Sequence, residues 1–327
     1  MSPAPSARVC LGPLLRCSPV VPQKGELRVC EFAGRLVYPF KVWRFICGAM
    51  LHRAICKGRE RDYWRVKVIS PTVTVAARRV EGGVAQGIDE TLAAEVPVAI
   101  QFNGRAHAVM LATPADLEDF ALGFALTEGI VRRADELTLV EQTWTPEGVV
   151  LDIRIPEMRF ALLDTRERNL TGRTGCGLCG TSTLEAAIRP VRRPDPHGPR
   201  ADAQALREGM ERLATMQPYN DASGAVHAAG LLTDDGGFTV REDVGRHNAI
   251  DKAVGAVARA GGRPHSLLVT SRASYEVVHK AAEVGCRLVA AISAPTALAV
   301  QLATEAGITL IGWARPPRLT VYSGELT

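Results

Sequence analysis

The chain has 327 residues, 46% hydrophobic and 23% charged, a composition typical of a globular protein with one large core or two modest ones. Its net charge of +4 is unevenly spread, because residues 1–68 carry 13 Lys and Arg against four Asp and Glu, whereas the remainder carries 26 against 31. The folded part is therefore mildly acidic, and the basic charge of the whole chain does not indicate a nucleic-acid partner.

Cysteine is also concentrated near the N-terminus, with five of the eight residues in the first 56. The other three, Cys176, Cys179 and Cys286, are too few for a disulfide scaffold, so we expect a reducing, cytoplasmic compartment. Charged residues interrupt the most apolar early segment, 42–56, and no clean signal-peptide core follows the first arginine. The sequence therefore predicts no membrane span and no cleaved leader.

The extension formed by residues 1–68 is basic and rich in cysteine, and it mixes Pro, Arg, Cys and Trp without a sustained period. We expect this segment to be poorly ordered, or to reflect a start codon assigned too far upstream. A functional basic or metal-binding arm is the alternative interpretation.

The first folded region, residues 69–170, is predicted to be a small α+β unit rich in hairpins. Strand-like runs occur at 72–75, 96–102, 105–111, 137–142 and 149–155. The dipeptide Asn103-Gly104 between the second and third runs is typical of a type I′ hairpin turn.

One helix is predicted between these strands. Thr113-Pro114 and Asp116 indicate its start, with a capping residue and with proline at the first helical position. Apolar residues at helical spacing follow, and Gly129 is placed to end the helix.

Residues 171–200 combine a glycine-rich cysteine loop with a Pro- and Arg-rich linker, and residues 201–327 alternate helices with strands. Helices are predicted at 183–188, 202–216, 247–259, 274–283 and 296–306. Strands are predicted at 227–232, 238–241, 266–270, 287–292 and 308–313. Strands of continuous apolar character imply an α/β sheet covered on both faces. The order of these elements resembles the three-layer cytidine-deaminase-like fold.

The stretch Gly-Arg-Thr-Gly-Cys-Gly-Leu-Cys-Gly, residues 172–180, carries the most reactive side chains of the chain. Its glycines allow backbone conformations that other residues avoid, so the loop can move its sulfur atoms. The cation of Arg173 favours the thiolate form of Cys176 and Cys179. These features suit a sulfur carrier, a redox pair or half of a metal site.

Other interpretations of this pair are less well supported. The spelling Gly-x-Gly-x-x-Gly is no dinucleotide fingerprint here, because no βαβ unit follows it. A structural zinc site needs four ligands, but Cys286 is the only other thiol beyond the extension and the histidines stand singly. A zinc deaminase would need a His-x-Glu motif, which the chain lacks.

Arginine and capping residues gather at three predicted helix starts: Arg246-His247-Asn248, Ser271-Arg272-Ala273-Ser274 and Ser293-Ala294-Pro295-Thr296. Helix N-termini beside arginines suit phosphate groups. Taken singly, each site is more simply read as caps and surface charges. If the strands lie side by side, however, the three ends converge at the carboxyl edge of one sheet, where α/β proteins bind ligands.

A further candidate site follows the last predicted strand. It comprises Trp313, Ala314, Arg315, Pro316, Pro317 and Arg318. An aromatic ring with two guanidinium groups can stack a base and hold a phosphate. An exposed tryptophan and two prolines that simply end the strand are the alternative.

Taken together, these segments resemble the formate dehydrogenase accessory sulfurtransferases, the FdhD-type family. The likeness covers about residues 69–327. It rests on long motifs in the family's order, at residues 113–120, 172–180, 241–252, 271–276 and 292–299.

The resemblance implies a sulfur carrier. A cysteine desulfurase would pass sulfane sulfur to Cys176 as a persulfide, with Cys179 in an auxiliary role. The sulfur would then reach the bis-molybdopterin guanine dinucleotide cofactor before this enters the catalytic subunit of formate dehydrogenase. The family also implies a homodimer. A cofactor chaperone without sulfur chemistry and a zinc-stabilised module are the alternatives.

The family's cofactor-binding stretch maps onto residues 313–318, where Trp313 stands in place of the usual phenylalanine. From the helix starts we add Arg246, His247 and Arg272 as weaker candidates for the same cofactor. No residue is assigned to a metal. Whether the cofactor carries molybdenum or tungsten, and which formate dehydrogenase is served, stays open.

Overall fold

The computed structural model describes residues 31–32, 35–36, 70–168, 190–199 and 202–326. The chain divides into two compact units, Met1–Tyr63 and Trp64–Thr327. In the first unit the described residues form two short paired strands, β1 (Glu31–Phe32) and β2 (Arg35–Leu36). The predicted regions 69–170 and 201–327 both lie in the second unit, which carries the fold described below.

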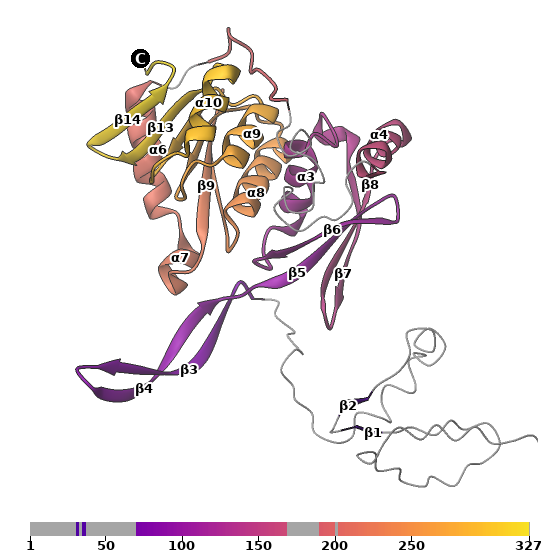
Figure 1. Cartoon of the computed structure of the whole chain (residues 1–327), viewed down its shortest axis with the longest axis vertical. Coiled ribbons are helices and arrows are strands. Elements are labelled where there is room, and N and C mark those ends of the chain that lie inside the picture. The colour runs from indigo at the N-terminus through magenta and orange to yellow at the C-terminus, as the bar shows by residue number, and fades with distance from the viewer. Residues whose placement is uncertain (1–30, 33–34, 37–69, 169–189, 200–201, 327) are drawn as a thin grey trace, which may run out of the picture. The chain divides into compact units, whose positions relative to one another are not determined.

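The second unit opens with a hairpin and a four-stranded sheet (Figure 1). The hairpin pairs β3 (Thr72–Glu81) with β4 (Val84–Ala93). The sheet has the order β6-β5-β8-β7, with β5 (Val96–Phe102), β6 (Arg105–Ala112), β7 (Thr138–Thr145) and β8 (Gly148–Arg154). Its helical elements are α3 (Leu117–Thr127), the 3-10 helix η1 (Ala134–Glu136) and α4 (Glu157–Arg168).

Most of the strands predicted in this region are confirmed. Asn103 and Gly104 form the turn between β5 and β6 with φ of 49° and 77°, as a type I′ turn requires. The strand predicted at 72–75, however, is only the beginning of β3. The hairpin turns at Gly82-Gly83, a dipeptide that favours such turns, and β4 was not predicted.

The start of α3 differs from the prediction. Asp116 precedes the helix with φ of 54° and makes no capping bond through its side chain, and Pro114 lies outside the helix. Thr113 is already engaged elsewhere, since its N–H donates to Asp243 and its hydroxyl accepts from the N–H of Val244. Residues 114–116 therefore connect a fixed point to the helix and do not form its first turn.

The end of α3 is confirmed. Gly129 follows the helix with φ of 65°, and its N–H donates to the carbonyl of Leu126. Helix α4 was not predicted. Its Phe160 and Leu163 pack against the core of the four-stranded sheet. The predicted helix at 183–188 lies outside the described residues, and residues 190–199 contain no helix or strand, as expected of a linker.

The C-terminal part of this unit is a six-stranded sheet of order β10-β9-β11-β12-β13-β14. Its strands are β9 (His227–Thr233), β10 (Phe238–Asp243), β11 (Pro264–Val269), β12 (Leu288–Ala291), β13 (Thr309–Arg315) and β14 (Arg318–Ser323). Neighbours β11, β12 and β13 run parallel, and the remaining pairs are antiparallel.

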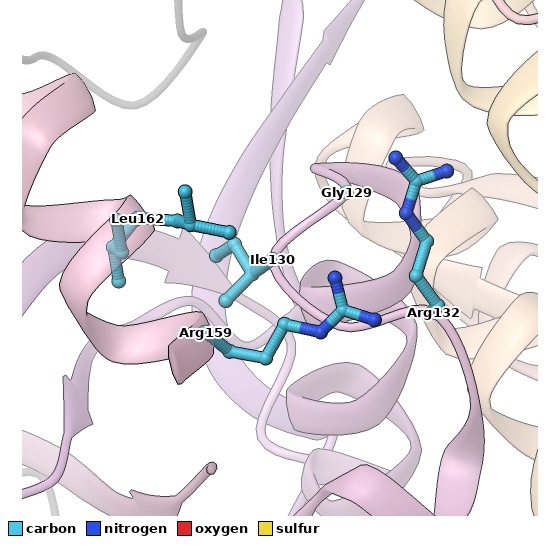
Figure 2. A pocket seen from close by; sticks show the side chains of 6 residues that line it. Gly129, Ile130, Arg132, Arg159 and Leu162 are labelled. Atoms are coloured by element: carbon cyan, nitrogen blue, oxygen red, sulfur yellow. The ribbon is translucent and has the colours of Figure 1, made fainter. Parts of the chain in front are cut away.

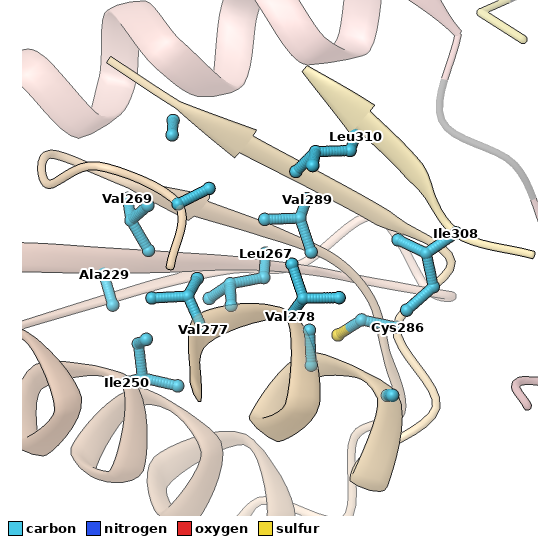
Figure 3. Packing of buried hydrophobic residues seen from close by; sticks show 14 of the residues in the cluster. Ala229, Ile250, Leu267, Val269, Val277, Val278, Cys286, Val289, Ile308 and Leu310 are labelled. Atoms are coloured by element: carbon cyan, nitrogen blue, oxygen red, sulfur yellow. The ribbon is translucent and has the colours of Figure 1, made fainter. Parts of the chain in front are cut away.

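Helices cover both faces of this sheet, as predicted. The helices of this part of the chain are α6 (Ala203–Thr215), α7 (Pro218–Ser223), α8 (Arg246–Arg259), α9 (Tyr275–Glu283) and α10 (Ala297–Ala306). Helices α8, α9 and α10 pack on one face, where Val277, Leu267 and Val289 meet (Figure 3), and α6 packs on the other. Short α7 and strand β14 were not predicted. The mixed α/β architecture is confirmed, and the cytidine-deaminase-like assignment stays a prediction.

The two sheets are joined by a close crossing of α3 and α8. A Cβ added at Gly123 would lie 1.6 Å from the carbonyl oxygen of Asp251, and one at Gly255 would lie 1.9 Å from that of Asp119. Both obstacles are backbone atoms, which cannot rotate away as the end of a side chain could. The two helices can therefore approach this closely only because each has a glycine at the crossing.

We expect Gly123→Ala to separate α3 from α8 and to destabilise the protein by about 3 kcal/mol or more, the upper range for overpacked cores. Thermal unfolding measures this as a lower Tm. Gly87→Ala is the matched control, because a Cβ there has nothing within 4 Å. Equal Tm values for the two variants would contradict this account of the crossing.

Candidate functional site

The candidate site lies at one edge of the six-stranded sheet. Because β10 and β11 are both antiparallel to β9, the strands β10, β11, β12 and β13 all end at the same edge. Contacts join the segments that follow them. The N–H of Thr296 donates to Ala273, and the N–H of Trp313 donates to Ser293. These contacts join the starts of α9 and α10 to each other and to Trp313, and α8 begins after β10 at the same edge, so the predicted convergence of the three helix starts is observed.

The run 241–252 enters α8, and most of its polar side chains have structural partners. Arg241 pairs with Asp119 of α3 at 2.9 Å. Glu242 accepts the N–H groups of Tyr219 and Asn220 at the start of α7.

Three more residues of this run lie in a second buried group. Lys252 lies 2.6 Å from Asp243, and both side chains are fully buried. Asn248 does not cap its helix, because its amide donates to Asp243 and to the carbonyl of Leu111.

Arg246 and His247 are the exceptions in this run. Among the described residues, Arg246 Nε and His247 Nε2 are buried without a hydrogen-bond partner. Such atoms carry a desolvation cost of about 1–3 kcal/mol each, so they often mark a position where a ligand or water binds. The two residues of α8 that were predicted as site residues thus differ from the rest of the run, because each keeps a buried polar atom without a partner among the described residues.

His247 faces charged groups of α8 and α9. Its Nε2 lies 3.9 Å from Oε2 of Glu276 on α9, which accepts a 2.7 Å hydrogen bond from Ser274. Burial, together with the cations of Lys280 and Arg246, lowers the pKa of His247 to about 4, so the ring is neutral at physiological pH. Glu276 belongs to the motif at residues 271–276, on which the family resemblance partly rests, but it was not predicted as a site residue.

Lys280 belongs to a buried group beside His247. Its ammonium contacts Asp251 at 2.8 Å, Thr127 at 2.8 Å and Glu128 at 3.1 Å. Burial raises the pKa of Asp251 to about 6, below neutral pH, so the carboxylate stays charged opposite the ammonium. This group joins α3, α8 and α9 directly behind the candidate site.

The other two helix starts differ from each other. Thr296 caps α10, since its side chain accepts the N–H of Ala299. Ser274 does not cap α9, because its hydroxyl donates to Glu276. Arg272 is exposed in the loop before α9, with no side-chain partner among the described residues. The interpretation as plain caps therefore holds only for α10.

Residues 313–318 comprise the end of β13, the turn at Pro316-Pro317 and the first residue of β14, so they continue into a further strand and do not end the last one. Trp313, with φ of 51°, is 37% exposed, and the guanidinium of Arg318 lies 5.3 Å from its ring centroid. Arg315, Pro316 and Pro317 are exposed, with a cis bond between the prolines.

Two residues fix this hairpin against the sheet edge. Ala314 is buried in the core, so its side chain does not face a ligand. A Cβ at Gly312 would lie 2.7 Å from Pro295, so glycine lets the strand approach the loop before α10. An aromatic ring and two cations are thus presented on a supported turn.

The predicted nucleophiles Cys176 and Cys179 lie outside the described residues. Cys286 is buried in the core, as Figure 3 shows, and burial raises the pKa of its thiol. It is therefore unsuited to nucleophilic chemistry. Among the residues with a described position, no three His, Cys, Asp or Glu side chains are grouped to hold a metal ion.

A separate hollow of about 60 Å³ lies between α4 and the segment after α3 (Figure 2). It is lined by Gly129, Ile130, Arg132, Arg159, Leu162 and Leu163. None of these residues was predicted as a site.

Within the described ranges, no helix combines the length and the apolar character needed to cross a membrane.

Comparisons with known proteins agree on one family. A model of the FdhD/NarQ family matches residues 93–326. A protein from Variovorax paradoxus, named sulfur carrier protein FdhD, is 50% identical over 235 residues, which cover 71% of this chain and 84% of the relative. A protein of the same name from Xanthomonas campestris pv. campestris is 50% identical over 257 residues, covering 77% and 90%.

A solved structure shares the fold. The crystal structure of a protein assigned as a formate dehydrogenase accessory protein from Desulfotalea psychrophila superposes with a TM-score of 0.58. The likeness covers 78% of this chain and 98% of that protein at 23% identity, and it is evidence for the fold alone. From the family match and the two relatives, this chain belongs to the FdhD/NarQ family.

Proposed function

We propose that this protein is a sulfur carrier in formate dehydrogenase maturation, with Cys176 as the residue that holds the sulfur. The observation that carries the proposal is membership of the family, whose relatives at 50% identity are named sulfur carrier proteins. The Cys-x-x-Cys loop supports it, since it supplies two thiols among glycines and beside an arginine.

The loading step is a thiol–persulfide exchange. The Cys176 thiolate attacks the outer sulfur of a persulfide on a cysteine desulfurase, the sulfur–sulfur bond of the donor breaks, and the donor cysteine leaves as a thiolate. One sulfane atom changes carrier, and no external oxidant or reductant is needed. Cys179 would assist by closing a disulfide with Cys176 when the sulfur leaves as sulfide.

The acceptor in this proposal is the bis-molybdopterin guanine dinucleotide cofactor, which is handled as a substrate. The sheet edge offers suitable groups for its nucleotide end. Trp313 can stack a base, and Arg315 and Arg318 can hold phosphates. Arg246 and His247 lie on the same edge, with buried polar atoms that lack partners among the described residues.

We also propose a homodimer. The β3–β4 hairpin contacts α7 but belongs to neither larger sheet, and a two-stranded hairpin is marginally stable by itself. It nevertheless exposes Val75 and Leu92 at 37% and 42% on one face. Apolar side chains on such an arm favour packing against a second copy of the chain. A partner of this kind would also stabilise the hairpin.

Sulfur loading tests the carrier directly. After incubation with a cysteine desulfurase and cysteine, mass spectrometry is expected to find one added sulfur on Cys176. We expect Cys176→Ser to lose this mass and to abolish formate dehydrogenase activation while the protein stays folded. Cys179→Ser, the matched control, is expected to retain loading. If Cys176→Ser still activates the enzyme, the cofactor-chaperone alternative replaces this proposal.

Cofactor binding is tested with GDP as a probe of the nucleotide end. Loss of a charge-assisted hydrogen bond is expected to make Arg318→Ala bind GDP about 10- to 100-fold more weakly in calorimetry. Arg263→Ala is the control, because this exposed arginine lies just before the first residue of β11, at the end of that strand far from the candidate site. Equal affinities for both variants would remove the hairpin turn from the site.

The dimer is tested by light scattering coupled to size exclusion. Val75→Asp with Leu92→Asp places charges on the apolar face of the hairpin, so we expect the variant to be monomeric. Val80→Asp is the control, because Val80 is exposed but lies on the other face of β3. A monomeric wild-type protein would contradict the proposed dimer.

A further inference from the structure

Helix α4 turns a pair of apolar side chains toward solvent. Met158 is 72% exposed and Leu162 is 53% exposed. Their spacing of four residues places them on one face of the helix. Phe160 and Leu163 pack into the core of the four-stranded sheet, so the orientation of α4 is fixed. The exposed pair is therefore a consequence of the fold and not of a loosely attached helix.

Two arginines line the hollow beside this pair. Arg132 and Arg159 line it together with Leu162, as Figure 2 shows. Arg159 is held by Glu136 through two hydrogen bonds of 3.0 Å, and this contact lowers the pKa of the glutamate, so the pair is charged at neutral pH. The guanidinium of Arg132 is exposed and has no side-chain partner among the described residues. An acidic side chain from a partner could therefore bind Arg132 there.

The position of α4 in the chain connects this surface to the reactive cysteine. The helix ends at Arg168, and Cys176 follows eight residues later. Eight residues span at most about 26–29 Å. A protein interface of ordinary size buries about 800 Å² per partner and is of similar width, so a macromolecule that reaches Cys176 can contact α4 at the same time.

We propose that Met158, Leu162 and Arg132 form the docking surface for the sulfur donor. The donor would present an acidic side chain to Arg132, with apolar residues around it that cover Met158 and Leu162. Apolar contact supplies affinity, and the single charge pair orients the complex. This inference rests on the proposed function, because it assumes that a persulfide-bearing enzyme delivers sulfur to Cys176.

The experiment compares two sulfur sources. The rate of sulfur addition to Cys176 is measured with limiting cysteine desulfurase and, separately, with glutathione persulfide, a small donor that needs no docking. We expect Met158→Asp with Leu162→Asp, and Arg132→Glu alone, to slow enzyme-dependent loading at least tenfold. Loading by glutathione persulfide is expected to stay at the wild-type rate.

Two further variants act as controls. Met216→Asp introduces the same charge at an exposed residue beyond the end of α6, and it is expected to load at the wild-type rate from both sources. Arg132→Lys keeps the positive charge and is expected to retain most of the enzyme-dependent rate. Loss in Arg132→Glu with retention in Arg132→Lys separates charge recognition from a purely structural role.

Several outcomes would overturn the docking surface. The first is that the variants Met158→Asp with Leu162→Asp, and Arg132→Glu, accept sulfur from the desulfurase at the wild-type rate. Equal slowing with both donors, or a lowered Tm at unchanged affinity for the desulfurase, would mean that the pair packs on its own chain. If wild-type protein accepts sulfur from glutathione persulfide but never from the desulfurase, the proposed function fails together with the docking surface. If enzyme-dependent loading is lost only in the Met158/Leu162 and Arg132→Glu variants, the result supports both the proposed function and the docking surface.

Discussion

The arrangement of the second unit depends on the buried carboxylate of Asp243. Lys252 lies 2.6 Å away, and the same carboxylate accepts the N–H groups of Thr113 and Gly245. The end of β6, the end of β10 and the start of α8 are thereby held at one point. Loss of one partner of such a pair leaves a buried charge and costs about 3–5 kcal/mol. This contact fixes how the four-stranded sheet meets the six-stranded sheet.

The residues of the run 241–252, which includes both partners of this contact, have two different roles. Structural partners account for most of its polar residues, while Arg246 and His247 project from the start of α8 with buried atoms that lack partners among the described residues. Most polar residues of this motif therefore stabilise the fold and position Arg246 and His247, the two residues that are candidates for binding a ligand. Stability and recognition are encoded in one short segment.

In the proposed function, the chain separates reception of sulfur from its delivery. Helix α4 ends shortly before the cysteine pair, and α6 begins the C-terminal part of the unit after the linker. A donor would meet the α4 side, and the cofactor would meet the edge that carries Trp313 and Arg318. The intervening residues would supply the nucleophile Cys176, and their glycines would suit a loop that serves two large partners in turn.

The sequence by itself determined most of the elements and placed the two thiols of the cysteine pair among glycines. Hydrophobic periodicity located most helices and strands, and Asn103-Gly104 set its own turn, because these are local properties of the backbone. Short α7, strand β14 and the true start of α3 depend on distant contacts, such as Thr113 with Asp243. Only the tertiary structure decided that Asn248 supports the fold while His247 remains available, since a side chain's partners are set by the packing of separate elements and not by its neighbours in sequence.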